Sequence, residues 1–295
     1  MKVCFIGLGT MGYPMAGHLQ QKGFDLSVYN RSKGKAQQWS TQYQIAASAT
    51  VAAAVAEAEI VAVCLGADAD VREVLAGNGG VFSAMPRGGV VIDHSTTSAA
   101  LAREMAACAQ ERGISFIDAP VSGGEAGAIN GRLTVMAGGD ETVFTRIEPV
   151  LAAYATRYQC LGPVGSGQLA KMVNQICIAG LIQGLAESIH FGAAAGLDMN
   201  AVLDVIGAGA AQSWQMDNRA KTMLAGEFDF GFAVDWMRKD LGYVLDEARQ
   251  RKVSLPVTAL VDQFYGQVQN LDGGHLDTSS LLLALQQGAE CVVKG

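Results

Sequence analysis

The apolar pattern of this 295-residue chain changes abruptly near residue 162, and this change limits the fold more than any other feature. Before it, short runs rich in Val and Ile alternate with longer helical stretches. After the turn at 162–167, helical periodicity rich in Ala, Leu and Met continues toward the last residues. Strands that alternate with helices are typical of a parallel sheet with crossover helices. We therefore predict an α/β domain over 1–163 and an all-α domain over 164–295.

The period of the apolar positions places the individual elements. We expect strands at 3–6, 26–30, 60–65, 90–93, 115–118 and 133–137. We expect helices at 11–21, 46–58, 69–75, 98–111 and 141–153. A long interdomain helix follows at about 166–196. Its small residues predict that it is buried against close neighbours: Gly180, Gly184, Gly192 and Gly196.

Composition and charge narrow the classes of partner. The net charge of -7 disfavours nucleic acid and anionic membrane surfaces. We find no charged leader before an apolar run, and no run of the roughly 18 apolar residues that a membrane span needs. The six cysteines lack metal-site or CxxC spacing: Cys4, Cys64, Cys108, Cys160, Cys177 and Cys291. We expect a cytoplasmic protein with buried reduced thiols, no metal and a small-molecule partner.

The first strand runs directly into the pattern G-x-G-x-x-G, which opens a helix. Gly7 permits a tight turn, Gly9 lets the backbone approach a pyrophosphate, and Gly12 allows the helix to pack on the strand. The amides of Thr10 and Met11 stand at the positive end of the helix dipole. Glycines at such a turn can also serve packing alone. The strand before and the helix after nevertheless favour dinucleotide binding by a Rossmann-type domain.

The end of the second strand bears on the choice of cofactor. NAD enzymes usually carry an acidic residue there for the ribose hydroxyls, whereas this chain has Asn30, Arg31 and Ser32. A guanidinium and a hydroxyl suit a 2′-phosphate, and Lys33 and Lys35 add positive charge. The alternative is an ordinary solvated basic turn. We predict NADP(H) as the preferred cofactor, with NAD(H) possible.

Two further segments carry groups suited to a small acid. Ser122, Gly123 and Gly124 leave a strand after a proline, and successive glycine amides beside a hydroxyl form a concavity that suits a carboxylate. A flexible turn is the alternative. Lys171 lies on the long helix, with Asn174 and Gln175 three and four residues later on the same face. Taken alone, such a lysine is more often a solvated surface residue.

Four segments together resemble the β-hydroxyacid dehydrogenase family, whose members include 3-hydroxyisobutyrate dehydrogenase, tartronate semialdehyde reductase and succinic semialdehyde/glyoxylate reductases. They span nearly the whole chain in the family's order: FIGLGTMGYPMA at 5–16, DAPVSGG at 118–124, GQLAKMVN at 167–174 and KDLG at 239–242. The resemblance implies a nicotinamide-dependent enzyme with a Rossmann-type domain and a helical domain. It also implies an oligomer, a homodimer or homotetramer, because relatives interlock their helices between subunits.

The resemblance assigns roles residue by residue. It implies that Lys171 is the general acid in carbonyl reduction and that the segment 122–124 holds the substrate carboxylate. Asn174 and Gln175 line the same pocket. Lys239 and Asp240 resemble a pair presented at the cofactor and the active site, with Lys239 also facing the substrate. Two residues complete the cofactor wall near the nicotinamide: Thr96 and Leu65.

Some positions depart from the family pattern or fit it loosely. Many relatives have a second asparagine where this chain has Gln175, and its longer side chain can change which substrates fit. Gly66 replaces a proline, and His18 replaces an asparagine in the helix of the glycine loop; we expect His18 to be structural. Trp214 lies near a loop that covers the substrate in relatives, although core packing fits this aromatic equally well.

These observations together predict an NADPH-dependent reductase of small carboxylate-bearing aldehydes or ketones, reversible as a β-hydroxyacid dehydrogenase. Candidate substrates are glyoxylate, succinic semialdehyde, tartronate semialdehyde and methylmalonate semialdehyde. The basic turn at 30–32 favours the succinic semialdehyde/glyoxylate reductase branch. The alternatives are an NAD-dependent 3-hydroxyisobutyrate dehydrogenase and a catalytically silent NADP-binding interaction module. Retention of Lys171, Ser122 and Asn174 argues against the silent module.

Overall fold

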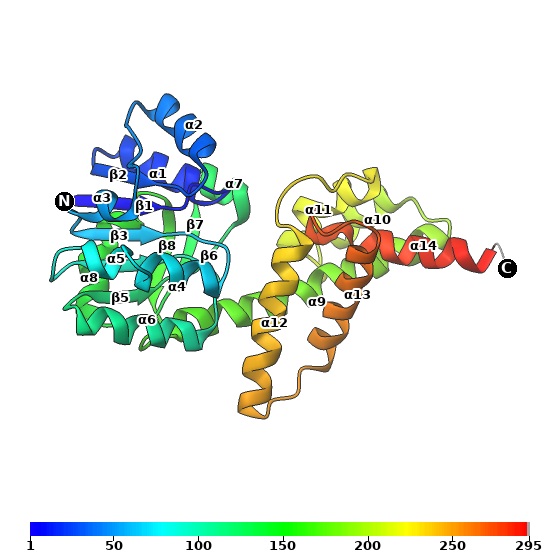
Figure 1. Ribbon diagram of the computed structural model, residues 1–295. Helices are drawn as coiled ribbons and strands as arrows, with labels where there is room; N and C mark the ends of the chain where they lie inside the picture. The colour runs from blue at the N-terminus through cyan, green and yellow to red at the C-terminus, as the bar shows by residue number, and fades with distance from the viewer. Residues whose placement is uncertain (294–295) are drawn as a thin grey trace. The chain divides into compact units, whose positions relative to one another are not determined.

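The computed structural model describes the backbone of residues 1–293 and the side chains of residues 1–287. Internal contacts divide the chain into two compact units, Met1–Lys171 and Met172–Gly295. The strands of the described chain lie in the first unit, and the second is built from helices (Figure 1). The predicted α/β domain followed by a helical domain is confirmed. The division by contacts falls inside helix α9 (Ser166–Ala194), whereas the sequence suggested a boundary in the preceding turn.

A parallel sheet of order β2-β1-β3-β4-β5 forms the centre of the first unit. Its strands are β1 Lys2–Ile6, β2 Asp25–Tyr29, β3 Ile60–Val63, β4 Val90–Asp93 and β5 Ser115–Asp118. Because all five strands run in one direction, their carboxyl ends meet at one edge, where Asp93 pairs in register with Asp118. Ligands of open parallel sheets bind at this edge.

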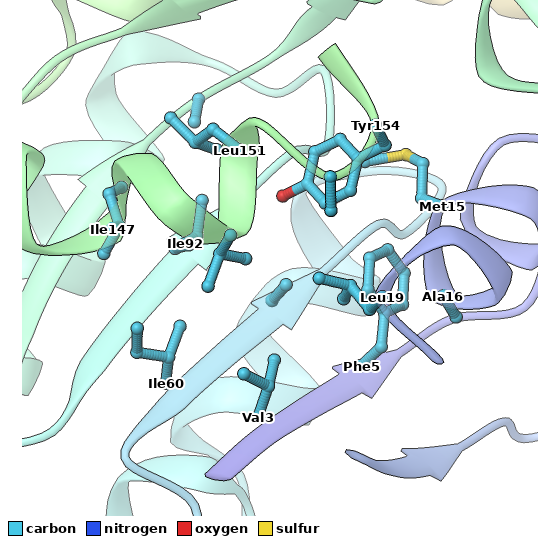
Figure 2. Packing of buried hydrophobic residues seen from close by; sticks show 14 of the residues in the cluster. Val3, Phe5, Met15, Ala16, Leu19, Ile60, Ile92, Ile147, Leu151 and Tyr154 are labelled. Carbon is cyan, nitrogen blue, oxygen red and sulfur yellow. The ribbon is translucent and has the colours of Figure 1, made fainter. Parts of the chain in front are cut away.

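Both faces of this sheet are covered by helices, as the continuous apolar strands require. Val3 and Phe5 face one core with side chains of α1 (Gly12–Gln21) and α8 (Glu141–Leu151), which Figure 2 shows from close by. The intervening Cys4 and Ile6 face a second core. That core is completed by α3 Val51–Val55, α4 Asp68–Ala76, α5 Val81–Ala84 and α6 Ala99–Glu111.

A second, smaller sheet corrects one expectation. The strand predicted at 133–137 forms as β7 (Leu133–Ala137), but it does not join the large sheet. It pairs antiparallel with β6 (Val121–Ser122) and parallel with β8 (Ala155–Cys160). Neither partner was predicted, because β6 has two residues and β8 is a polar, mostly exposed strand.

The remaining helices of the first unit also differ from the prediction in part. The structure adds α2 (Lys33–Tyr43), the short α5 and α7 (Gly124–Ile129), and the expected helix at 46–58 is shortened to α3. In α2 only Ala36 and Trp39 are buried, so its apolar period is weak.

Seven helical segments make up the second unit, and their apolar faces meet in one core. α9 crosses from the first unit; it is followed by α10 Met199–Ile206, α11 Trp214–Ala225, α12 Val234–Arg251, α13 Pro256–Asn270, the 3-10 turn Thr278–Ser280 and α14 Leu281–Val293. Ile182, Leu185 and Ile189 of α9 pack in this core with Met237 and Leu241 of α12.

Helix α9 requires two corrections. It has 29 residues and an apolar stretch with a mean hydropathy of 1.3, so by length and composition it could cross a membrane, contrary to the sequence reading. This is weak support for a span, because helices of globular cores pass the same test and α9 contributes to such a core. It is also less buried than expected: a side chain at Gly180 or Gly184 would meet open space.

The cysteines follow the prediction only in part. No disulfide joins the cysteines among residues 1–287. Cys4 is buried, and desolvation raises the pKa of its thiol to about 12. Cys177, however, is exposed on α9, because it stands on the face that turns away from the core. Cys291 lies outside the residues whose side chains are described.

Candidate cofactor and catalytic site

The glycine loop between β1 and α1 is held by close backbone contacts. Gly7 has a φ of +98°, and a Cβ there would lie 2.2 Å from the carbonyl oxygen of Cys64. A Cβ at Gly12 would lie 1.9 Å from the carbonyl oxygen of Gly7. Both positions therefore require glycine, because no side chain fits between these backbone segments.

The middle of the same loop is open. A Cβ at Gly9 would meet no atom within 4 Å, and Thr10 is exposed. Helix α1 begins after Met11, whose side chain makes no cap hydrogen bond among the described residues. An uncapped helix start beside an accessible glycine fits the pyrophosphate of a dinucleotide, which brings its own acceptor oxygens.

Asn30, at the end of β2, ties the loop to its neighbour. Its Oδ1 accepts a hydrogen bond of 2.8 Å from the amide of Leu8, and its Nδ2 donates to the carbonyl of Ser32 at 3.0 Å. The side chain therefore supports the backbone of both turns, a contact that sequence spacing did not reveal. A direct bond from Asn30 to a cofactor stays a prediction.

The basic residues after β2 face solvent. The side chain of Arg31 is 80% exposed, and Ser32 and Lys35 are exposed as well. The Nη1 atom of Arg31 lies 3.0 Å from Oδ1 of Asp70, which stands in the first turn of α4. This acidic partner was missed, because Asp70 is distant in sequence and belongs to no motif.

The loops after β3 and β4 are bound to each other. The amide of Leu65 donates to Oγ of Ser95 at 2.9 Å, and the amide of Ser95 donates to Oδ1 of Asp93 at 2.9 Å. Thr96, the next residue, is half-buried. The structure thus brings the two predicted wall residues, Leu65 and Thr96, onto directly connected loops.

Buried ionisable groups gather at the carboxyl ends of β4 and β5. Desolvation raises the pKa of Asp93 to about 7 and that of Asp118 to about 6, although backbone hydrogen bonds oppose both shifts. Desolvation also lowers the pKa of His94 to about 4. The His94 ring bonds the carbonyl of Ala119 and the hydroxyl of Tyr154, so it connects the end of β4 to the segments just before β6 and β8.

The predicted carboxylate loop is more ordered than a flexible turn. Ser122 ends β6 in register with Thr134, and α7 begins at Gly124. Gly123 has a φ of +127° and Gly124 a φ of +61°, conformations that side-chain-bearing residues rarely adopt. A Cβ at Gly124 would meet open space, so its backbone is accessible to a ligand.

The first turns of α9 carry the predicted proton donor. Lys171 is buried, with 8% of its surface exposed. By helical spacing, Asn174 and Gln175 share its face of the same helix. A buried ammonium beside amide groups can donate a proton to a carbonyl oxygen and stabilise the negative charge that develops there.

A polar chain links α9 to α12 within the second unit. Nδ2 of Asn174 donates to Oε1 of Gln175 at 2.8 Å, and Nε2 of Gln175 donates to Oδ2 of Asp240 at 2.8 Å. Nζ of Lys239 forms an ion pair with Oδ1 of Asp240 at 3.2 Å. The four predicted residues are thus brought together. The side-chain amide of Gln175 is hydrogen-bonded to Asn174 and Asp240, so its role as a substrate contact stays a prediction.

Two aromatic residues of the second unit lie near cations. Nζ of Lys239 lies 5.5 Å from the ring centre of Trp236. Trp214 is 51% exposed at the start of α11, where the guanidinium of Arg219 lies 5.0 Å from its ring centre. Trp214 is therefore not a core residue, which removes one of the two expectations for it. A role over the substrate stays a prediction.

Comparison with known families covers nearly the whole chain. A family model described as the NAD binding domain of 6-phosphogluconate dehydrogenase matches residues 2–162. A second, described as NAD-binding of NADP-dependent 3-hydroxyisobutyrate dehydrogenase, matches residues 165–285.

Individual relatives agree with both matches. An uncharacterized oxidoreductase of Shewanella frigidimarina is 56% identical over 97% of this chain and 98% of its own. The 2-hydroxy-3-oxopropionate reductase of Escherichia coli is 34% identical over 97% of each chain. The structure of Mycobacterium tuberculosis 3-hydroxyisobutyrate dehydrogenase with L-serine has a TM-score of 0.88 and 30% identity, covering 96% of this chain and 98% of that one.

Proposed function

Because the chain belongs to the β-hydroxyacid dehydrogenase family, a group of NAD(P)-dependent oxidoreductases that act on CH-OH groups, we propose that it is an NADPH-dependent reductase of small carboxylate-bearing aldehydes or ketones. The reaction is reversible as a β-hydroxyacid dehydrogenation. The observation that carries this proposal is the buried Lys171 on α9, in a chain whose glycine loop fits a dinucleotide.

Lys171 has the chemistry that carbonyl reduction needs. The bound nicotinamide supplies the hydride. As negative charge develops on the carbonyl oxygen, the Lys171 ammonium stabilises it and donates its proton to that oxygen. In the reverse direction the neutral amine accepts the hydroxyl proton. Burial helps both directions, because a group shielded from water interacts more strongly with the reacting oxygen.

We propose that the substrate carboxylate binds at Ser122, Gly123 and Gly124. Two glycines with positive φ turn their backbone sharply, and the open position beside Gly124 leaves room for an anion. Ser122 adds a hydroxyl donor. Asn174 and Lys239 are further proposed contacts, with Trp214 at the edge of the site.

The preference for NADPH rests on Arg31. Its exposed guanidinium can form two parallel hydrogen bonds with a 2′-phosphate. Lys35, which follows four residues later and is also exposed, adds positive charge. Asp70 competes for Arg31, which would reduce the preference. We expect kcat/KM to favour NADPH over NADH. Arg31→Ala should lower this ratio by about tenfold or more, and Asp70→Asn should raise it. A wild-type preference for NADH would contradict the assignment.

A substrate panel tests the reductase activity directly. NADPH oxidation would be followed with glyoxylate, succinic semialdehyde, tartronate semialdehyde and methylmalonate semialdehyde. Tartronate semialdehyde is included because the E. coli relative is named as its reductase, 2-hydroxy-3-oxopropionate being the same compound. Turnover of at least one carboxylate-bearing carbonyl is expected. Cofactor binding without turnover of any of them would support the silent binding module instead.

We further propose a cytoplasmic homodimer or homotetramer assembled through α9. One stripe of this helix is exposed and apolar or small: Cys177, Leu181, Gly184 and Phe191. A Cβ at Gly184 would meet open space, so another helix can approach closely there. Leu181→Glu should dissociate the oligomer in analytical ultracentrifugation. Val253→Glu, at an exposed apolar residue off the stripe, should leave the mass unchanged.

A further inference from the structure

Gln168 connects the start of α9 to the loop that follows β4. It stands in the first turn of α9 and is fully buried. Its Oε1 accepts a hydrogen bond of 3.0 Å from the amide of Thr97, and its Nε2 donates to the carbonyl of Ser95 at 2.8 Å. One side-chain amide therefore fixes the backbone on both sides of Thr96.

The turn that carries Gln168 is itself anchored on β5. The Asp118 carboxylate accepts hydrogen bonds from the amide of Gly165 at 2.7 Å and from the amide of Gln168 at 2.9 Å. A Cβ at Gly167 would lie 2.5 Å from the carbonyl oxygen of Met136, so this backbone packs closely against β7. These contacts attach the start of α9 to the end of β5.

Lys171 lies three residues after Gln168, on the next turn of α9. From this geometry we infer that Gln168 is a positioning residue, which holds the Ser95–Thr97 loop and the turn bearing Lys171 in one fixed arrangement. The inference rests on the proposed function, in which Thr96 faces the nicotinamide and Lys171 donates the proton. Hydride and proton must reach the same carbonyl group, so an error in the spacing between their sources slows the chemical step without weakening cofactor binding.

Two nearly isosteric variants separate positioning from packing. Gln168→Met removes both hydrogen bonds and keeps the volume. Gln168→Glu keeps the acceptor for the Thr97 amide but places an oxygen against the Ser95 carbonyl, which only the protonated acid can satisfy. The matched control is Gln183→Met. Gln183 is also buried on α9, and its amide bonds Glu187 one turn away.

Gln168→Met should lower kcat by about 100-fold while the dissociation constant for NADPH changes by less than about threefold. Amide hydrogen exchange at Thr97, measured on the cofactor-free protein, should become faster by about tenfold or more. Gln183→Met should match the wild type in all three measurements. Thermal melting of each variant shows that the protein remains folded.

The pH profile supplies a readout that a packing role would not move. In Gln168→Glu, activity relative to the wild type should rise by about tenfold between about pH 8 and pH 6, because protonation restores the donor to the Ser95 carbonyl. Two carboxyl groups bond the backbone on either side of the new carboxyl and favour its protonated form: Asp118 accepts from the amide of residue 168, and Asp93 accepts from the amide of Ser95. Each value is divided by the wild-type value at the same pH, which corrects for the pH effects that both proteins share.

The outcomes are distinct. Suppose that the wild type reduces a carbonyl and that Gln168→Met leaves both kcat and the Thr97 exchange rate unchanged. This result would overturn the inference and leave the proposed function intact. An increase in the NADPH dissociation constant as large as the loss in kcat would also overturn it, since Gln168 would then serve cofactor binding. Absence of wild-type turnover on every carbonyl tested would overturn the proposed function, and this inference with it.

Discussion

The helices α1 and α9 both begin in glycine-containing turns of the first unit, and their N-terminal ends differ sharply. α1 follows β1; its start makes no side-chain cap hydrogen bond among the described residues, and Gly9 beside it faces open space. α9 follows β8, and its start is filled by the protein itself, because the Asp118 carboxylate accepts from the amides of Gly165 and Gln168. We call the start of α1 the open end and the start of α9 the closed end.

The difference shows how one physical property serves two purposes. Every helix start has amides without partners in the helix and the positive end of a dipole, both of which favour an anion. At the open end of α1 we propose that a ligand supplies that anion and can bind and leave. At the closed end of α9 it is a buried side chain, so the turn is fixed and Lys171 is carried at a set place. In the proposed function, cofactor binding uses the open end and the chemical step uses the closed end.

The closed end should matter most for the chemical step. Lys171→Ala is expected to lower kcat by about 10³-fold or more, because both the proton donor and the charge that stabilises the oxygen are lost. The dissociation constant for NADPH should change little, since the open end is untouched. Steady-state kinetics with the best carbonyl of the panel and a fluorescence titration of NADPH measure the two effects.

Lys221→Ala is the matched control, because Lys221 is an exposed lysine on α11. It should retain wild-type kcat. A Lys171→Ala enzyme with near-normal kcat would show that another group donates the proton, and would leave the closed end with a structural role alone.

The open end should matter most for binding, and its glycines allow a clean separation. Gly9→Ala meets no atom in the protein, so the fold should be unchanged while the dissociation constant for NADPH rises by about ten- to 100-fold. Gly12→Ala would clash with the carbonyl oxygen of Gly7, so it should weaken binding and lower the melting temperature together. If Gly9→Ala binds NADPH normally, the open end of α1 is not the phosphate site.

The two ends also differ in how far the sequence predicts them. The open end is local: Gly7, Gly9 and Gly12 lie in one short segment between a strand and a helix, so spacing alone indicated its purpose. The closed end joins Asp118 and Gln168, which are 50 positions apart. Both residues lie in segments that resemble the family, yet nothing in their spacing reveals that they touch. Arg31 and Asp70 are a similar pair, visible only once the first turn of α4 meets the turn after β2.

The fold shows the same distinction between local and distant causes. The apolar strands of the large sheet were predicted because both of its faces are buried. β8 and α2 were missed, since β8 is mostly exposed and α2 buries only Ala36 and Trp39. The start of α3 could have been found from Thr50, whose hydroxyl accepts from the amide of Ala53, as helix-capping threonines do. The predicted helix instead began at residue 46, because residues 46–49 are rich in alanine.

Removing the charge at the closed end tests its contribution to stability. Asp118→Asn keeps the shape of the side chain. Its Nδ2 atom, however, faces one of the two amides, of Gly165 and Gln168, that now donate hydrogen bonds to the carboxylate. The amide left without a partner costs about 2 kcal/mol. Near pH 8, however, the variant also loses a buried charge whose desolvation raises the pKa of Asp118 to about 6, which relieves a penalty of up to about 3 kcal/mol. The free energy of unfolding should therefore change by less than about 1.5 kcal/mol, and chemical denaturation measures this change. A loss of about 3 kcal/mol or more would mean that the hydrogen bonds of the carboxylate outweigh the cost of its burial.

The smallest expected effect is a pH dependence of stability at the closed end. Burial raises the pKa of Asp93 to about 7, and Oδ2 of this side chain has no hydrogen-bond partner in the described part of the protein. Above about pH 4 the unfolded chain has lost a proton that the folded protein keeps. The stability that Asp93 contributes is therefore fully present below about pH 4 and is lost as the pH rises through about 7. Asp118 acts with the same sign, but mostly below about pH 6, because its pKa is raised less.

Between about pH 6 and 7, a comparison of the wild type with an Asp93 variant, both of which retain Asp118, separates the contribution of Asp93. Asp93→Asn removes its titration and keeps an oxygen that can accept from the Ser95 amide. The wild-type free energy of unfolding should fall with rising pH more steeply than that of the variant, by up to about 1 kcal/mol per pH unit. Urea denaturation at closely spaced pH values measures both slopes. Equal slopes would mean that Asp93 is ionised in the folded protein throughout this range, and the closed end would then hold two buried charges side by side.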